Sequence, residues 1–202
     1  MVRWRLGNER VLTFRFNDAA HHAREDEKRT LEQFREELKR IVFLEKLGSV
    51  WDRSNRLERW MAGCDAWAGD AAGQERGRRA ARLCKADLAS HMVAELPELQ
   101  GVMGALYALR DGEDPAVAEA IENHYRPRAA GDPIPETHGA RLLALADRLD
   151  LLVAAFSLGF LPTGSSDPFG LRRAAAGVVA LLQELPTELE LPALLALSYR
   201  TF

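Results

Sequence analysis

Residues Met92 to Gly104 read MVAELPELQGVMG, and this string separates one helical region of the chain from the next. A proline inside a helix removes a backbone hydrogen bond, and each glycine there weakens the helix by about 1 kcal/mol. Pro97, Gly101 and Gly104 therefore make the string a poor continuous helix. Because a sequence that only filled a core would rarely use such residues, we expect the string to have a particular structural or functional task.

A second string of the same kind runs from Leu161 to Arg173 and reads LPTGSSDPFGLRR. Asp167 followed by Pro168 is typical of a helix start, with aspartate as the N-cap and proline at the first helical position. Arg172 and Arg173 then fall in the first turn of the predicted helix, where cations oppose the helix dipole. Two explanations stay open: one arginine pairs with a buried carboxylate of a neighbouring helix, or the two hold an external phosphate.

Outward from these strings, nearly every segment spaces its apolar residues at the three- to four-residue period of a helix, and no clear strand stands out. Asp114 and Pro115 repeat the pattern of N-cap and proline, and Thr137 is a further candidate N-cap. We therefore predict an all-α fold, a bundle of about seven to nine helices. The predicted helices cover residues 11–22, 26–47, 57–69, 75–94, 97–110, a segment from 115 onward, 137–158 and 167–184.

The composition is that of an ordinary soluble globular protein, with 47% apolar and 28% charged residues and a formal net charge of −3. This charge argues against binding of polyanions over the whole surface, but it leaves room for a local basic face. The amino-terminal residues lack an apolar signal core, and no apolar run approaches the ~18 residues of a membrane span. We expect a cytoplasmic protein with no membrane partner. Cys64 and Cys84 have no metal-binding spacing, so we expect buried, reduced thiols.

Aspartates within apolar helical segments are the candidates for chemistry. Asp87 lies in the string LCKADL, and Asp147 and Asp150 are three residues apart on one helix face. Two separated, half-buried aspartates on helices resemble the metal-binding HD phosphohydrolase superfamily, in which a His-Asp dyad ends one helix and a distant aspartate completes the site. Asp87 and Asp147 fit the two acidic positions, but Ala86 stands where the histidine would be.

A site without that histidine would hold a transition metal poorly, because such metals in catalytic sites normally use imidazole ligands. We therefore predict an inactive site with no metal and no cofactor, in which a positive side chain of the protein neutralises the two aspartates. The five histidines add no metal-binding spacing, and no nucleotide-binding loop or nucleophile motif is present. The predicted vestigial pocket comprises Asp87, Asp147 and Asp150 with the candidate cations Lys85, Arg172 and Arg173.

Arginines also cluster at places that could face RNA. Arg53, Arg56 and Arg59 are three residues apart and would form one ridge of a helix. Such ridges are usually solvated helix faces, and contact with an RNA backbone is the functional alternative, which would be salt-dependent. The remaining candidates crowd the start of another helix and a proline-rich loop: Arg76, Arg78, Arg79, Arg126 and Arg128.

Both unusual strings, together with shorter strings in the same order, resemble the β subunit family of the bacterial two-subunit glycyl-tRNA synthetase. The resemblance spans about residues 7–180, and the two long strings are specific to it. The shorter strings include Gly7 to Leu12, Lys85 to Leu88, Ala130 to Asp132, Ala146-Asp147 and Leu149-Asp150.

The resemblance implies that the chain is the central HD-like region of a longer β subunit. Residues 1–202 would form a single HD-like helical domain, and residues 185–202 would begin the following segment. In that family the α subunit activates glycine with ATP and magnesium, whereas the β subunit recognises the tRNA and is needed for transfer. The expected partners are tRNA(Gly), the α subunit and the remaining β-subunit domains. The fragment alone is expected to support the ligase without being catalytic.

Two other functions stay open at this point. One is an active, metal-dependent HD-type phosphohydrolase that acts on nucleotides, with Asp87 and Asp147 as metal ligands; Ala86 argues against it. The other is a stand-alone interaction scaffold that derives from a truncated synthetase gene.

Overall fold

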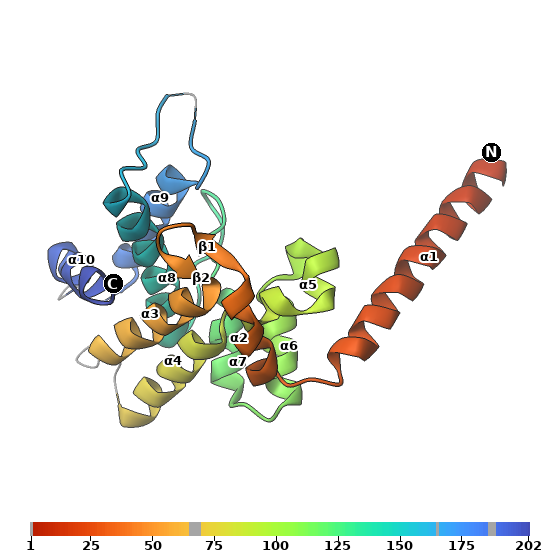
Figure 1. The fold of residues 1–202 in the computed structure, drawn as a ribbon, viewed down its shortest axis with the longest axis horizontal. Helices are drawn as coiled ribbons and strands as arrows, with labels where there is room; N and C mark the ends of the chain where they lie inside the picture. The colour runs from red at the N-terminus through yellow and green to blue at the C-terminus, as the bar shows by residue number, and fades with distance from the viewer. Residues whose placement is uncertain (1, 65–69, 165, 186–188) are drawn as a thin grey trace.

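The computed structural model describes residues 2–64, 70–164, 166–185 and 189–202, with residues 2–8 as backbone only. The fold is helical, so the predicted all-α class is confirmed (Figure 1). Within these ranges, no helix is both long enough and apolar enough to cross a membrane. The α-helices are α1 (Val2–Asp26), α2 (Leu31–Glu37), α3 (Val50–Gly63), α4 (Ala71–Leu83), α5 (His91–Glu95), α6 (Val102–Arg110), α7 (Pro115–Asn123), α8 (His138–Ser157), α9 (Leu171–Gln183) and α10 (Leu191–Arg200). Shorter elements are the 3-10 turns η1 (Leu38–Arg40), η3 (Ala86–Ala89) and η4 (Pro97–Leu99), and the antiparallel strands β1 (Val42–Leu44) and β2 (Gly48–Ser49).

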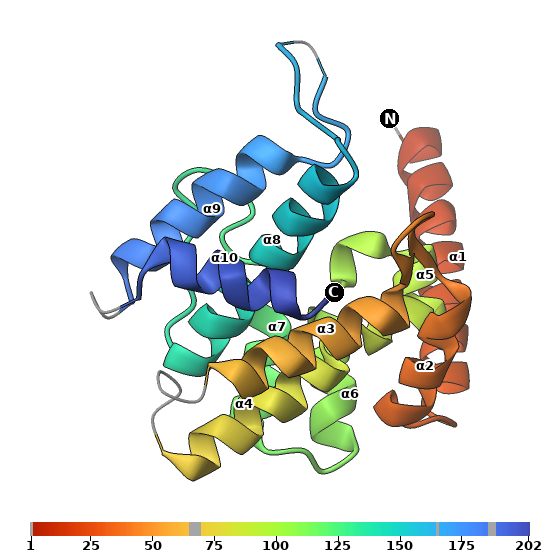
Figure 2. The ribbon, with the colours of Figure 1, turned by 60° about the vertical axis from the view of Figure 1, so that its left-hand side comes forward.

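Helix α8 lies at the centre of the bundle. Its leucines Leu142, Leu143, Leu145 and Leu149 are fully buried, and α3, α4, α7, α9 and α10 all contact it. Figure 2 shows α3 and α4 side by side, with α9 beyond α8 on the opposite side of the bundle. Residues on α8 are therefore placed to meet side chains from several other helices.

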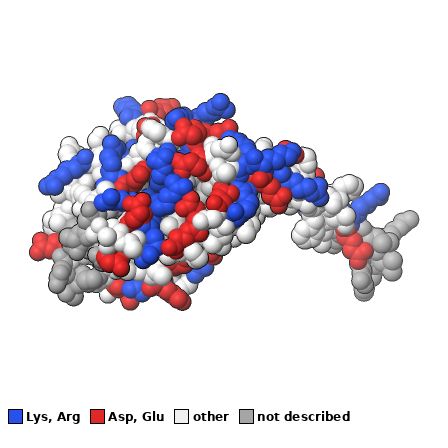
Figure 3. Space-filling view, turned by 90° about the horizontal axis from the view of Figure 1, so that it is seen from below, with Lys and Arg blue, Asp and Glu red and all other residues white. Residues whose placement is uncertain are grey.

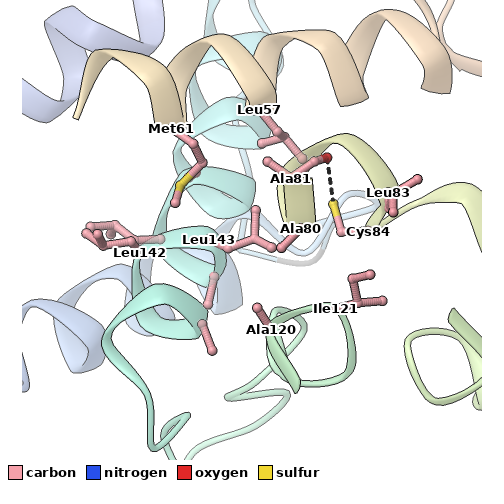
Figure 4. Close-up of a cluster of buried hydrophobic side chains, with 14 of the residues drawn as sticks. Leu57, Met61, Ala80, Ala81, Leu83, Cys84, Ala120, Ile121, Leu142 and Leu143 are labelled. Atoms are coloured by element: carbon pink, nitrogen blue, oxygen red, sulfur yellow. Dashed lines mark hydrogen bonds between the residues drawn. The ribbon is translucent and has the colours of Figure 1, made fainter. Parts of the chain in front are cut away.

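Small and branched side chains fill the core around α8. Leu57 and Met61 of α3, Ala80 of α4, Ile121 of α7 and Leu143 of α8 gather in one cluster (Figure 4), and each is at most 2% exposed. Burial of a leucine, isoleucine or methionine side chain contributes about 1.5–3 kcal/mol. This cluster fixes the spacing between α3, α4 and α8, on which the charged residues described below depend.

The cysteines and two of the tryptophans can be placed relative to this core. Cys64 and Cys84 are buried, as predicted, and burial raises the pKa of the Cys84 thiol to about 12. Trp60 is buried and donates from its indole nitrogen to the Ser198 hydroxyl, 2.8 Å away. Trp51 is only half-buried, and Trp67 lies outside the described residues.

Helix α1 projects from the bundle and packs on α5 (Figure 1). Its last residue, Asp26, is fully buried and accepts hydrogen bonds from the backbone amides of His91 and Met92 and from the Tyr107 hydroxyl. Burial alone would raise the pKa of Asp26, but these hydrogen bonds hold it below its usual value. Asp26 therefore ties α1 to the start of α5.

The predicted helix over residues 26–47 is wrong at residues 27–30, which separate α1 from α2, and again beyond Glu37. The expectation of no strand is wrong as well. The apolar run from Ile41 to Leu44 has the composition of a strand, and it forms β1. Gly48 turns the chain at a φ of 81°, a conformation that favours glycine. Ser49 and Asp52 then form a capping box that starts α3, earlier than the predicted helix over residues 57–69.

The predicted helix over residues 75–94 is divided. Helix α4 ends at Leu83, and η3 and α5 follow it. Ser90 explains the division, because its hydroxyl donates to the Asp87 carbonyl at 2.7 Å and accepts from the Val93 amide at 3.2 Å. As a result, Asp87 turns into the core at η3 instead of lying within a continuous helix.

The predicted helix over residues 97–110 begins later than expected, because Gly101 interrupts it. Pro97 starts only η4, and α6 follows Gly101, whose φ is 83°. A Cβ atom on Gly101 would lie 3.0 Å from the Glu122 carbonyl oxygen, and one on Gly104 would lie 2.8 Å from Cγ2 of Ile121. Both glycines therefore allow the first string to approach α7 closely.

Helices α7 and α8 begin at the predicted caps, whereas α9 does not. Helix α9 starts at Leu171 after Gly170, which has a φ of 67°, and not at Pro168. The carboxylate of Asp167 still caps the helix, because it accepts from the amides of Leu171 at 2.7 Å and Arg172 at 3.0 Å.

Candidate functional site

A network of buried charges joins α3, the end of α4 and α8. Arg53 contacts both aspartates of α8: its Nη2 lies 3.0 Å from Asp147 Oδ1, and its Nε lies 3.2 Å from Asp150 Oδ2. Nε of Arg56 donates to Asp150 Oδ1 at 2.6 Å, and Nζ of Lys85 lies 2.9 Å from Asp147 Oδ1. We call Arg53, Arg56, Lys85, Asp147 and Asp150 the buried network. An unpaired buried charge costs several kcal/mol, so these ion pairs make the interior position of the five residues tolerable.

The surroundings of Lys85 fix the protonation of its neighbour His124. Nδ1 of His124 lies 2.6 Å from the Ile121 carbonyl, which can only accept, so Nδ1 carries the proton. Nε2 is then an acceptor for the Lys85 ammonium, 2.8 Å away. Burial and the charge of Lys85 hold the pKa of His124 well below its usual value, so the imidazole is neutral. The ammonium also lies 4.0 Å from the centre of the Tyr125 ring, which completes its enclosure.

The two ends of the Lys85–Asp147 pair shift in opposite senses. Burial raises the pKa of a carboxylate, but the charges of Arg53 and Lys85 hold the pKa of Asp147 below its usual value. Burial lowers the pKa of Lys85, and Asp147 opposes that shift. The carboxylate of Asp147 is therefore firmly ionised. For Lys85 the effect of burial prevails, and its pKa is lowered.

Asp87 is held by backbone amides and not by a cation. Its Oδ2 accepts from Gly101 at 2.6 Å and from Gly104 at 3.1 Å, whereas Oδ1 has no hydrogen-bond partner among the described residues. Burial raises the pKa of Asp87 to about 6, despite these amides and the nearby charge of Lys85. The glycines of the first string thus bring two N–H groups to a buried carboxylate.

The predicted pocket comes together only in part. Lys85 lies against Asp147, and Asp150 joins the same network through Arg53 and Arg56. One cation was predicted to neutralise both Asp87 and Asp147, but within the described ranges no ion pair reaches Asp87. Arg172 and Arg173 lie at the start of α9, where Arg172 donates to the Thr163 carbonyl and has no part in the network.

The predicted arginine ridge also differs from the structure. Arg56 is buried and Arg53 nearly so, because both point toward α8 and its aspartates. Only Arg59 is exposed, and its Nη2 donates to the Thr201 carbonyl at 2.7 Å. A spacing of three residues places side chains on one helix face, but it does not say whether that face meets water or another helix.

The arginines predicted near a helix start lie in the middle of α4, and Arg76 and Arg79 form surface ion pairs. Arg79 lies 2.5 Å from Glu113 and 2.9 Å from Glu32, and Arg76 lies 3.9 Å from Asp114. Arg78, on the same helix, also has a partner. Figure 3 shows basic and acidic side chains interleaved over one face of the molecule, so this face is not a continuous basic surface.

Arg148 is a buried residue that the sequence reasoning did not assign to the pocket. Its guanidinium donates to the carbonyls of His124, Ala144, Tyr125 and Pro127 at 2.7–3.2 Å, which anchors the segment after α7 on α8. Gly177 of α9 makes room for it, because a Cβ atom there would lie 2.4 Å from Nε of Arg148. Its place between Asp147 and Asp150 in the string ADRLD was the sequence feature that could have indicated a buried position.

A cleft of about 270 Å³ opens above Asp147. The segment after α7 contributes Tyr125 and Arg128, and Asp147 lies on α8. Both unusual strings also reach this cleft: Gln100 belongs to the first, and Phe169, Gly170 and Arg173 belong to the second. The two stretches that the sequence marks as poor helix formers therefore converge on one place.

The residues beneath this cleft do not fit a metal ion. The Lys85 ammonium lies beside Asp147, and Asp87 accepts from amides of the backbone. Ala86, next to Asp87 in the chain, has no side-chain ligand to offer. In the part of the chain that the structure describes, no three histidine, cysteine, aspartate or glutamate side chains gather as a metal site would require.

Comparisons with known proteins place the chain among synthetase subunits. The family model described as "Glycyl-tRNA synthetase beta subunit" matches residues 3–202. The glycine–tRNA ligase beta subunit of Aromatoleum aromaticum is 51% identical over 190 residues, which are 93% of this chain and 27% of that protein. The beta subunit of Desulfitobacterium hafniense is 43% identical over 203 residues, 100% of this chain and 29% of that protein. That of Neisseria gonorrhoeae is 49% identical over 179 residues, 88% of this chain and 26% of that protein. The chain thus spans less than a third of the length of these relatives.

Proposed function

This chain belongs to the glycyl-tRNA synthetase beta subunit family, and from that premise we propose that it is a non-catalytic, HD-like helical part of a glycine–tRNA ligase that helps to hold tRNA(Gly). In this function the chain supports the attachment of glycine to tRNA(Gly) without activating glycine. Activation, with its ATP and magnesium, belongs to the α subunit. The α subunit and the rest of the β subunit are the protein partners, and the complex works in the cytoplasm.

The observation that carries the non-catalytic part of this proposal is the buried network. In an active HD site, the two acidic positions hold a metal ion; here Lys85 lies 2.9 Å from Asp147, and Asp87 accepts from two glycine amides. The charges that could bind a metal thus connect α3, α4 and α8 to one another. Such a network favours a scaffold over a hydrolase.

The RNA-holding part of the proposal rests on the arginines that the fold leaves outside the network. Arg126 and Arg128 flank Pro127 after α7, and Arg128 is exposed. Among the described residues, Arg76 forms one long ion pair, with Asp114 at 3.9 Å; both side chains are more than 40% exposed, so a phosphate could compete for Arg76. Arg53 and Arg56, in contrast, are not proposed to touch RNA, because both are inside.

The test is binding of tRNA(Gly) to the chain as salt is raised. Each phosphate contact contributes a salt slope of roughly −0.7 to −0.9, so three arginines predict a slope of about −2 to −3. We expect weak binding with this slope and no release of phosphate from nucleotides when manganese is added. Undetectable binding at low salt would leave a purely architectural function. Manganese-dependent hydrolysis that Asp147→Asn abolishes would identify a phosphohydrolase instead.

A further inference from the structure

We propose that the cleft above Asp147 binds a phosphate-bearing nucleotide, with Arg128 and Arg173 on the phosphate and the base against the wall of Phe169. This inference deepens the proposed function, because it gives RNA a specific point of contact where both unusual strings meet. The bound chemistry is a phosphate next to a planar ring. It could come from a single-stranded segment of RNA or from a free nucleotide, and the experiment below distinguishes the two.

The first support is that both arginines at the rim of the cleft lack a protein partner. Within the described ranges, no hydrogen bond and no ion pair engages the guanidinium of Arg128 or of Arg173. An added Cβ atom on Gly170 would lie 2.7 Å from Nη2 of Arg173, so this guanidinium lies over the left-handed glycine at the rim. Two unpartnered guanidinium groups at one opening are suited to bidentate contact with a phosphate.

The acidic residues near the rim are engaged elsewhere. Asp132 accepts from the backbone amide of Arg128 at 2.7 Å, and Asp167 accepts from the amides at the start of α9. The pKa of Asp167 is lowered, and the hydrogen bond from the Arg172 amide is the largest cause. The charges of Arg172 and Arg173 lower this pKa further. These carboxylates reduce the positive field around the cleft, but they do not lie in ion pairs with Arg128 or Arg173.

The floor of the cleft does not cancel the charge of the rim. Asp147 faces the cleft, but Arg53 and Lys85 both contact it, so its negative charge is matched from below. Arg148 also lines the cleft, and its hydrogen bonds go to neutral carbonyls. Around Asp147, four cations that are buried or nearly so, Arg53, Arg56, Lys85 and Arg148, stand against three buried carboxylates, Asp87, Asp147 and Asp150. An anion that enters the cleft therefore meets a net positive charge.

The walls and the size of the cleft suit one nucleotide. Phe169 and Leu151 supply apolar surface, Tyr125 supplies an aromatic ring, and Gln100 supplies an amide that can donate and accept. The ring of Phe169 packs on that of Phe160, with 4.9 Å between the ring centres, so it is held in place. A volume of about 270 Å³ lies near the lower end of the range for ligand pockets and therefore suits one nucleotide better than a longer ligand.

The experiment compares two probes on the same protein: 5′-AMP, followed by calorimetry, and a labelled single-stranded RNA of five nucleotides, followed by fluorescence anisotropy. The variants are R173Q and R128Q, each of which removes one rim charge, and the control is R200Q, which removes an exposed arginine of α10 that does not line the cleft. We expect each rim variant to weaken binding about tenfold, as loss of one charged hydrogen bond does, and the control to change it by less than about twofold. Equal thermal unfolding curves would establish that all three variants fold.

The outcomes distinguish an RNA strand from a free nucleotide, and the cleft from the proposed function. If the RNA binds more tightly than 5′-AMP and both rim variants weaken it, the cleft holds a nucleotide of a strand; the reverse order assigns a free nucleotide. The inference is overturned if neither probe binds, or if R173Q and R128Q weaken binding no more than R200Q. Binding of tRNA(Gly), measured in parallel, tells the two failures apart. Salt-dependent tRNA binding that neither rim variant weakens would eliminate the cleft and would leave the proposed function to Arg76 and Arg126. If 5′-AMP binds and either rim variant weakens it, but tRNA(Gly) does not bind, the cleft is retained and the proposed function is eliminated.

Discussion

The molecule builds two charge networks from the same kinds of residue, one inside and one on its surface. In the buried network the ion-pair distances are 2.6–3.2 Å, and the side chains are at most 14% exposed. We call Glu32, Arg79, Arg82 and Glu113 the surface network; its distances are 2.5–2.9 Å, and its side chains are 18–36% exposed. The distances alone do not distinguish the two.

The two networks differ in how far water reaches their charges. In the surface network, solvent screens each charge and can replace a lost partner, so such pairs contribute little to stability. In the buried network, a charge that loses its partner stays in the interior without compensation. Ion pairs of similar length therefore differ in their effect. The buried pairs fix how α3 packs on α8, whereas the surface pairs add little to the packing of α2, α4 and the loop before α7.

The largest effect is expected for Asp150→Ala. The substitution leaves Arg56 without its carboxylate and removes one of the two aspartates that contact Arg53. Removal of one partner from a buried pair costs about 3–5 kcal/mol of unfolding free energy. Denaturant unfolding of the variant should show this loss. A cost below about 1 kcal/mol would mean that the buried network behaves like the surface network.

A smaller effect is expected for Lys85→Met. Asp147 keeps Arg53, so only one of its two cations is lost, and the Nε2 atom of His124 loses its donor. We expect a loss of about 2 kcal/mol in the same denaturant measurement. The matched control is Lys39→Met, which removes an exposed lysine paired with Glu36 and should cost less than about 0.5 kcal/mol. Equal costs for the two lysines would contradict the difference between interior and surface.

Asp87 should give stability a pH dependence of its own. Its folded pKa of about 6 is raised above that of the unfolded chain, so the folded state binds more protons and stability falls as pH rises. Between pH 5 and pH 7 this loss should be about 1 kcal/mol. Asp87→Asn keeps an oxygen that accepts from Gly101 and Gly104 but cannot ionise. From pH 5 to pH 7 the original chain should therefore lose about 1 kcal/mol of unfolding free energy relative to the variant. A difference that does not change with pH would mean that Asp87 is not the titrating group.

The smallest effect is expected for Glu113→Ala in the surface network. Arg79 loses a two-pronged partner but retains Glu32 and access to water. We expect a loss of less than about 1 kcal/mol, which shrinks further as salt is raised. The loss from Asp150→Ala should hardly respond to salt, because its surroundings are dry. If both losses respond to salt alike, the contrast between the networks is wrong.

The sequence predicts the helical class and several helix starts, because apolar periodicity and caps act locally. Thr137 and Asp114 are examples, since each side chain accepts from an amide two or three residues ahead. The errors come where a contact distant in sequence overrides the local pattern. Gly101 breaks a helix to let its backbone reach Glu122, and Ser90 divides another so that Asp87 faces inward. Neither partner can be identified from spacing alone.

The candidate site was predictable to a similar extent. The aspartates Asp87 and Asp147 stand out because they interrupt apolar helical segments, and Lys85 is close to the first of them in sequence. That Arg53 and Arg56 are the other cations could not be read from the chain, because they lie 94 residues from the carboxylates they meet. For Arg172 and Arg173 the sequence left an internal ion pair and an external phosphate open; in the structure both are exposed, and Arg172 donates to the Thr163 carbonyl.

The most direct measurement is the metal content of the purified protein, together with titration of manganese into the original chain and into Asp147→Asn. The central claim is that the protein's own Lys85 and Arg53 neutralise Asp147, so that no metal ion does. We predict far less than one equivalent of manganese, iron or zinc, and no saturable binding of added manganese. About one equivalent of metal that disappears in Asp147→Asn would contradict the claim.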